Sequence, residues 1–177
     1  MKTSIKAAVG GVSAALSVVL MFLGGILYIF TYAVPMVLGI LMSALKKSFS
    51  VSCAICVFVA VSVLSFILVP EKEIVLMYML FFGWYPLIRD ELNKIRPGFL
   101  SLPVKLILFN ICIFVIELIA YYVFGIPFFE DGVFSVSMLV LFAVLMNITF
   151  ILYDFMLSKF LILYERKLEK RILKIFG

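Results

Sequence analysis

The sequence predicts an all-α integral membrane protein, a compact bundle of six transmembrane helices with both ends in the cytoplasm. Of its 177 residues 66% are apolar and only 14% are charged, and the mean hydropathy is +1.29. A soluble chain of this size would have to expose too much apolar surface to water. Lipid requires every backbone N–H and C=O to be paired within the protein, and long apolar runs favour helices over the alternating strands of a barrel.

The placement of charge excludes several classes of function. The formal charge is +5, but Lys and Arg fall between the apolar runs, which is typical of membrane orientation and argues against a nucleic-acid partner. Histidine is absent, which removes the commonest metal ligand and any Ser-His or Cys-His pair. Cys53 and Cys56 form a C-x-x-C inside an apolar run, where small core residues are the better interpretation. We therefore expect no enzyme activity, metal or cofactor.

The first apolar run is long enough for two spans. No charge occurs in the 39 residues from Ala7 to Leu45. As one helix this run would extend about 58 Å at about 1.5 Å per residue, nearly twice the hydrocarbon thickness. It must therefore fold back, and the expected turn is either Gly24-Gly25 or the segment 31–35. Its start is interpreted as an uncleaved span, because the apolar character continues far beyond the length of a signal sequence.

Polar breaks divide the remaining chain into four further spans. The breaks are the lysine pair at 46–47, the segments 70–73 and 89–98, and the Gly- and Pro-containing segment 125–127. Pro86 lacks a backbone N–H and is expected to kink the fourth span. The single domain, 1–177, is therefore expected to contain spans over 7–23, 28–45, 49–69, 74–88, 103–124 and 133–157, followed by a basic amphipathic helical tail over 158–177.

Orientation follows from the loops between these spans. Fourteen of the fifteen Lys and Arg residues fall on the side that holds both termini and the second and fourth loops. The other side holds only Lys72, together with Glu71, Glu73, Glu130 and Asp131. Because positive charge stays on the cytoplasmic side, both termini are predicted in the cytoplasm of a multi-pass plasma-membrane protein, and the number of spans is predicted to be even.

Glu117 is the one acid predicted to lie deep within a span, and such charges are costly in lipid. Asn110, Glu117 and Tyr121 share a helical face by their seven- and four-residue spacing. One interpretation is a polar pocket that opens outward, in which Glu117, Tyr121 and Tyr78 of the fourth span bind a polar or cationic solute. The other is a hydrogen-bonded acid that holds helices together. Both remain open on the sequence alone.

Polar side chains of the sixth span have expected structural partners. Asn147, Asp154 and Ser158 share a face, and Asn147 falls near the depth of Asn110 in the antiparallel fifth span. We therefore predict an Asn110–Asn147 hydrogen bond. Asp154 is expected near the inner surface, within reach of Lys105 or Arg89, where a role in orientation or assembly is favoured over catalysis.

Small and aromatic residues mark two further features. Ala7, Gly11 and Ala15 form a stripe at helical spacing on the first span, which lets another helix approach closely. That helix belongs either to a partner subunit or to the bundle itself. In the fourth span, Trp84 and Tyr85 are interpreted as part of an interfacial aromatic belt in preference to a ligand-stacking site.

The six-span layout, the stripe of Ala7, Gly11 and Ala15 and the internal termini resemble the S components of energy-coupling factor transporters, their substrate-binding membrane subunits. The segments Leu80–Pro86 and Tyr153-Asp154 are also similar to small uncharacterised six-span membrane proteins of Firmicutes-type bacteria. The resemblance implies a first-helix stripe that docks on a transmembrane coupling subunit, separate ATPase subunits, and a pocket for a vitamin or metal in the outer halves of the later helices.

The expected function is thus a membrane-embedded, solute-binding subunit of an energy-coupling-factor-like uptake transporter for a small micronutrient. Nothing in the chain is expected to bind nucleotide, so coupling and ATPase subunits would supply the energy. The alternative is a non-transporting scaffold or assembly protein of the cell envelope, in which the polar residues only hold helices together. Copurification with ATPase subunits discriminates between the two.

Overall fold

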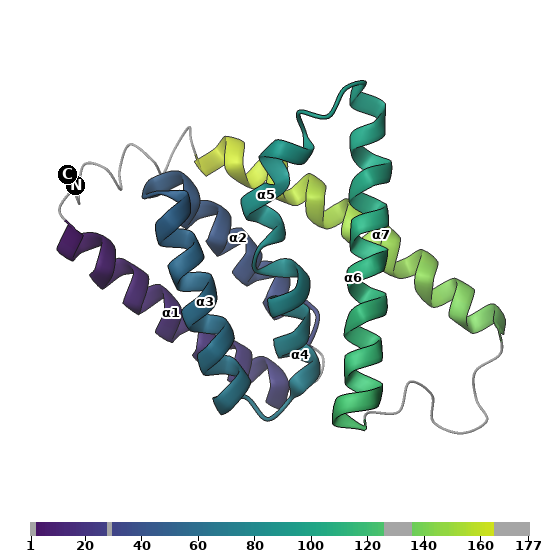
Figure 1. Ribbon diagram of the computed structural model, residues 1–177, viewed down its shortest axis with the longest axis horizontal. Helices are drawn as coiled ribbons and strands as arrows, with labels where there is room; N and C mark the ends of the chain where they lie inside the picture. The colour runs from purple at the N-terminus through teal and green to yellow at the C-terminus, as the bar shows by residue number, and fades with distance from the viewer. Residues whose placement is uncertain (1–2, 28–29, 126–135, 165–177) are drawn as a thin grey trace.

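The computed structural model describes residues 3–27, 30–125 and 136–164, and every regular element among them is helical (Figure 1). The elements are α1 (Thr3–Ile26), α2 (Ala33–Ser48), α3 (Val51–Leu68), α4 (Lys72–Met77), the π-helix η2 (Tyr78–Phe82), α5 (Tyr85–Leu92), the 3-10 turn η3 (Gly98–Leu100), α6 (Ser101–Phe124) and α7 (Val136–Leu163). Counting α4, η2 and α5 as one interrupted helix, the described chain makes six helical passes.

Four of the described helices are long and apolar enough to cross a membrane. They cover Ser4–Ile26, Val51–Leu68, Gly98–Phe124 and Val140–Leu163. The prediction of an all-α integral membrane protein is therefore confirmed at the level of four candidate spans. The other two predicted spans, the second and the fourth, coincide with shorter helices. Helix α2 has only 16 residues, with Lys46 and Lys47 in its last turn. The fourth pass is interrupted at η2.

The two shorter passes lie at the centre of the bundle. The interrupted pass runs between α3 and α6 (Figure 1) and contacts α1, α2, α3 and α6, and residues Ile74–Met77 of α4 are all buried. By contrast, most of the α7 surface is exposed. Backbone irregularity within a membrane is tolerated where protein covers it, so the central position accounts for a pass that is broken.

The break in the fourth pass has a local cause in its sequence. Pro86 lies in the first turn of α5 and has no N–H to donate to the carbonyl of Phe82 four residues earlier. The preceding turn is a π-helix, which is closed by a hydrogen bond from the Gly83 N–H to the Tyr78 carbonyl. The predicted kink at Pro86 is thus found as a helix interruption. It starts a new helix, α5, on which Tyr85 and Arg89 are one turn apart.

The turn between the first two passes does not lie at Gly24-Gly25, which was one of its two expected positions. Gly24 and Gly25 lie inside α1, which continues to Ile26, and α2 begins only at Ala33. Helix α1 thus continues three residues beyond the predicted end of the first span at 23, and residue 28, the predicted start of the second span, lies outside the described residues. The two glycines serve close packing instead, because a Cβ on Gly24 would lie 2.8 Å from Val34 and one on Gly25 would lie 2.9 Å from Glu71.

The later boundaries agree more closely with the sequence. Helix α3 begins with Ser50, whose side chain accepts a hydrogen bond from the Cys53 N–H at 3.2 Å, and α6 ends at Gly125, which has a left-handed φ of 63°. Helix α7 continues to Leu163, six residues beyond the predicted end at 157. Residues 126–135, with the predicted start of the sixth span, and 165–177, with most of the predicted tail, lie outside the described residues.

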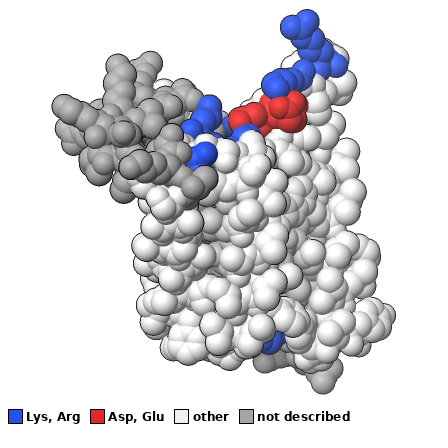
Figure 2. Space-filling view, turned by 60° about the vertical axis from the view of Figure 1, so that its left-hand side comes forward, with Lys and Arg blue, Asp and Glu red and all other residues white. Residues whose placement is uncertain are grey.

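The helices define two chemically different ends of the bundle. We call the basic end the one where α1, α3 and α6 begin and α2, α5 and α7 end. Charged side chains gather there, above flanks that are almost entirely uncharged on the face shown in Figure 2. At the opposite end, the Lys72 ammonium donates to the carbonyls of Phe66 and Val69 at 2.9 and 2.8 Å, and Glu71 caps α4.

Candidate functional site

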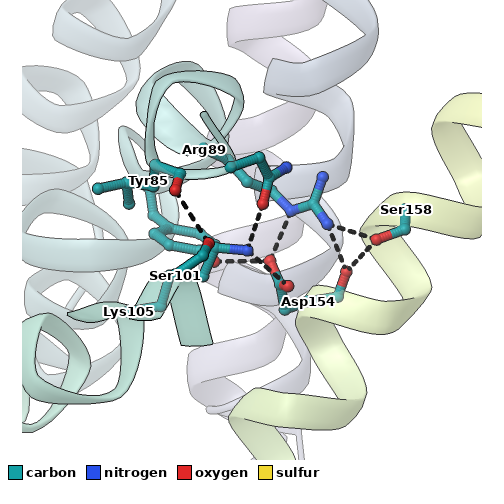
Figure 3. A network of polar contacts seen from close by, with 8 residues as sticks. Tyr85, Arg89, Ser101, Lys105, Asp154 and Ser158 are labelled. Atoms are coloured by element: carbon teal, nitrogen blue, oxygen red, sulfur yellow. Dashed lines mark hydrogen bonds and ion pairs between the residues drawn. The ribbon is translucent and has the colours of Figure 1, made fainter. Parts of the chain in front are cut away.

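At the basic end, a polar network joins α5, α6 and α7 around the Asp154 carboxylate (Figure 3). The Tyr85 hydroxyl and the Arg89 Nε donate to its Oδ1 at 2.6 and 2.5 Å, and the Lys105 ammonium donates to Oδ2 at 3.0 Å. The Arg89 Nη2 also donates to the Asp154 backbone carbonyl at 3.0 Å and to the Ser158 hydroxyl. This network fixes α7 to both neighbouring helices.

The network contains more positive than negative charge. The Arg89 and Lys105 side chains are only 6% and 5% exposed, and both contact Asp154, the single carboxylate that they share among the described residues. Lys105 also donates to the Asn93 side-chain oxygen at 2.6 Å. Buried charges are tolerated when they are paired and hydrogen-bonded. Arg89 and Lys105 therefore both depend on Asp154 for a counter-charge.

These contacts agree with the prediction for Asp154 and revise the one for Tyr85. Asp154 was expected within reach of Lys105 or Arg89, and it contacts both. Tyr85 was predicted to belong to an interfacial belt, but it is fully buried and its hydroxyl contacts Asp154. In the sequence, the signal for this contact was that Tyr85 lies four residues before Arg89, on the same helical face. That spacing does not give the direction of α5, which is set by the helix break at Pro86.

Further along α6 and α7, two asparagines bridge the helices where they cross. The Asn110 amide nitrogen donates to the Asn147 side-chain oxygen at 2.8 Å, and the Asn147 nitrogen returns a bond at 3.1 Å. Each amide nitrogen also donates to a carbonyl in its own helix, that of Leu106 or of Ala143. The predicted hydrogen bond is confirmed. Since both N–H groups of each amide are used, the pair has a structural role.

Beyond this crossing, a cleft of about 240 Å³ separates α6 from α7 on the side of the opposite end. In Figure 1 the two helices diverge from their crossing. The cleft is lined by Phe109, Asn110, Ile113, Phe114, Glu117, Phe142, Ala143 and Met146. Among the described lining residues, Glu117 is thus the one acid, and three phenylalanines and a methionine line the same cleft. The aromatic members were not predicted, because a phenylalanine in an apolar span carries no signal of its own.

The Glu117 carboxylate has no hydrogen bond or ion pair with any other described residue. It is only half-buried, and it lies close enough to Glu73 of α4 for the two carboxylates to repel each other. Glu73 in turn accepts a hydrogen bond from the Tyr32 hydroxyl at 2.6 Å. The cleft therefore contains a carboxylate for which the described part of the chain provides no partner.

The other two predicted pocket residues do not line this cleft. Tyr78 is completely buried on the far side of the fourth pass, with its ring 5.7 Å from that of Phe58 in α3, and its hydroxyl has no hydrogen-bond partner among the described residues. Tyr121 lies one turn beyond Glu117 on α6, is 52% exposed and packs edge-on against Tyr122. Of the three, only Glu117 is a lining residue of the cleft.

The small residues of α1 fall on two faces. Gly10 and Ala14 are buried, and Gly10 packs against Val57 of α3. Ala7, Gly11 and Ala15 are exposed. Ala7 and Gly11 belong to an apolar groove of about 440 Å³ between α1 and α3 at the basic end, which is also lined by Lys6, Gly10, Ala14, Ser50, Ser52, Cys53, Cys56, Val57 and Ala60.

Among the described residues, no group of three or more Cys, Asp or Glu side chains has a geometry that would hold a metal ion. Asp154 and Glu117, the two acids within α6 and α7, lie toward different ends of the bundle and do not form a pair. Comparison of the chain with protein-family models, curated proteins and solved structures gives no match.

Proposed function

We propose that the chain is the membrane-embedded binding subunit of an uptake system for a small solute, with Glu117 in the solute site. The single observation that carries this proposal is the Glu117 carboxylate in the cleft between α6 and α7, which has no hydrogen-bond or ion-pair partner among the described residues. A carboxylate whose role was only to hold helices together would be expected to form an ion pair or hydrogen bond within the protein, as Asp154 does with Arg89. The resemblance to S components of energy-coupling factor transporters also supports this function.

Partner subunits are part of the proposal. The chain has no nucleotide-binding motif, so an ATPase and a transmembrane coupling subunit would have to supply the energy. Ala7, Gly11 and Ala15 are the proposed docking stripe, and their exposure on α1 favours an external partner over the bundle interior. Side chains this small let a helix from another subunit approach the α1 backbone closely.

The proposed topology is six spans with both termini in the cytoplasm of a plasma-membrane protein. The basic end then faces the cytoplasm, in agreement with the excess of Lys and Arg on the cytoplasmic side of membrane proteins, and the cleft at Glu117 opens toward the outside. Reporter fusions test this proposal. A reporter fused after Arg96 should be cytoplasmic, and one inserted beside Lys72 should be external. The same location for both would refute the topology.

Native mass spectrometry of the tagged chain, purified from its own host, tests the function itself. The wild-type protein should retain a small solute, and Glu117→Gln should lose it while keeping the wild-type melting temperature. Glu91→Gln is the matched control, because the Glu91 side chain is 71% exposed at the basic end and pairs with Lys94 across one helical turn. Equal loss of solute and stability in Glu117→Gln would instead favour a structural role for the carboxylate.

A scaffold of the cell envelope is the second candidate, favoured by the apolar groove between α1 and α3. A docking groove serves a scaffold as well as a transporter. Purification of the tagged chain separates the two functions. ATPase subunits that copurify with the wild type and are lost from Gly11→Leu would support the transporter, whereas their absence from the wild-type preparation would support the scaffold.

A further inference from the structure

The chemistry of the Glu117 cleft restricts the kind of solute that it fits. Among the described residues that line it, Glu117 supplies one carboxylate, Phe109, Phe114 and Phe142 supply aromatic side chains, and Met146 supplies a thioether. The face of an aromatic ring attracts a cation within about 6 Å, and desolvated sites give the larger effects. One formal negative charge with three aromatic rings is a recognition set for a cation that carries apolar groups.

Charge argues against the other classes of ligand. An anion in the cleft would meet the Glu117 carboxylate, which Glu73 of α4 already repels. A divalent metal ion needs several oxygen ligands, but among the described residues that line the cleft only the Glu117 carboxylate and the Asn110 amide have side-chain oxygens. The oxygen of that amide already accepts a hydrogen bond from the Asn147 side chain at 3.1 Å. A neutral apolar solute would leave the half-buried carboxylate uncompensated.

The dimensions of the cleft set the size of the ligand. A volume of about 240 Å³ holds roughly eight groups of the size of a water molecule, at about 30 Å³ each. A substituted ammonium ion with a few methyl or methylene groups fits this volume. A nucleotide or a large cofactor does not.

We propose that the solute of this cleft is a small organic cation, a substituted or quaternary ammonium ion, paired with Glu117 and enclosed by Phe109, Phe114 and Phe142. The inference rests on the proposed function of the same cleft. It adds that recognition depends on the positive charge of the solute, so that a neutral molecule of equal shape is rejected.

Choline and its neutral carbon isostere 3,3-dimethyl-1-butanol are the probes that test this dependence on charge. Binding is measured by calorimetry on the full chain in lipid nanodiscs. Wild type and Glu91→Gln should bind choline at least tenfold more tightly than the isostere. Glu117→Gln should bind choline at least tenfold more weakly than wild type does, and its preference over the isostere should disappear. Phe142→Leu should weaken choline binding without changing the melting temperature.

Failure of this inference can be told apart from failure of the proposed function. Equal affinity for choline and the isostere, or retention of an anionic solute by the purified wild type, would overturn the cation inference and leave a binding subunit in place. If Glu117→Gln retains every solute that the wild type retains, the cleft is not the binding site and both proposals fall. A strong preference for choline that is lost only in Glu117→Gln supports both.

Discussion

The pair of helices α6 and α7 has two very different ends. At the basic end, Asp154 accepts hydrogen bonds from Tyr85, Arg89 and Lys105, and every group in the network has a partner. Toward the opposite end, Glu117 has no such partner among the described residues and borders a cleft. Both residues place a carboxylate in an apolar helix. The Asp154 carboxylate has several hydrogen-bond donors around it, whereas the Glu117 carboxylate has none among the described residues.

This difference separates a structural role from a binding role. A buried charge that is satisfied within the protein stabilises one arrangement of helices and has no remaining capacity for a ligand. A charge that the protein leaves unsatisfied gains most from a ligand that supplies the missing partner. The crossing at Asn110 and Asn147 lies between the two regions, so the basic end can hold α6 and α7 together while the cleft between them stays open.

The largest expected effect is that of Asp154→Asn. The substitution leaves Arg89 and Lys105 buried without a counter-charge, and removing one partner of a buried ion pair costs about 3–5 kcal/mol. Denaturation in mixed micelles, followed by circular dichroism, measures this loss in the free energy of unfolding. Asp90→Asn is the control, because Asp90 is 38% exposed and should cost less than about 1 kcal/mol. Wild-type stability in Asp154→Asn would contradict the structural role assigned to the network.

The second effect concerns the excess of positive charge. Lys105→Met removes one of two cations that share one carboxylate and leaves the Arg89–Asp154 pair intact. We expect a loss of about 1–2 kcal/mol, the scale of a lost hydrogen-bond partner, and thus well below the loss in Asp154→Asn. The same denaturation experiment compares the two variants. Equal losses would show that the positive charges are not in excess.

The third effect is that of the asparagine bridge. Asn110→Leu should destabilise the fold by about 0.6 to 2 kcal/mol, the range measured for hydrogen bonds between membrane helices. Asn147→Leu should cost a similar amount, and the double variant should cost less than the sum, because either single substitution already breaks the bridge. A double-mutant cycle measures this coupling. Strict additivity would mean that the bridge contributes nothing.

The smallest effect is a dependence of stability on pH at the rim of the basic end, outside the spans. The pKa of Asp90 is lowered: burial alone would raise it, but the Lys46 hydrogen bond at 2.7 Å and the charges of Lys46 and Lys47 outweigh burial. Because the folded-state pKa lies below the unfolded value of about 3.9, this stabilisation is present above pH 4 and is lost as the pH falls through the folded-state pKa.

Lys46→Met should remove most of this dependence. Its melting temperature should therefore change less than that of the wild type between pH 5 and pH 3. Lys159→Met, at the end of α7, is the matched control and should keep the wild-type profile. Identical profiles for wild type and Lys46→Met would show that the pair does not stabilise the fold.

Much of the architecture was predictable from the sequence, because apolar run length and the positions of Lys and Arg reflect the bilayer directly. The Asn110–Asn147 bond and the partners of Asp154 were predictable for the same reason, since antiparallel helices place residues of equal depth side by side. The boundaries of the first pass were not, because Gly24 and Gly25 serve either as a turn or as a packing site, and only the neighbouring Val34 and Glu71 decide which.

The candidate site was predictable only in part. Glu117 stood out as an acid in an apolar span, but its companions depend on which way α7 crosses α6. Tyr78 lies on the fourth pass as expected, but its side chain packs against Phe58 on α3 and does not line the cleft. Phe114 and Phe142 line the cleft, yet nothing distinguishes them in sequence from the other phenylalanines of the spans. Helix rotation and crossing are set by packing, and periodicity alone does not encode them.

The buried position of α2 and of the interrupted fourth pass has a consequence for biogenesis. A translocon releases segments into lipid according to their own hydrophobicity. Helix α2 has only 16 residues, and the fourth pass carries Arg89 after a break in its backbone. Neither segment is suited to leave the translocon alone. In the proposed six-span topology, each is expected to enter the bilayer as a hairpin with a longer neighbour, α2 with α1 or α3 and the fourth pass with α3 or α6. Nascent chains truncated after residue 92 should therefore insert their last segment poorly.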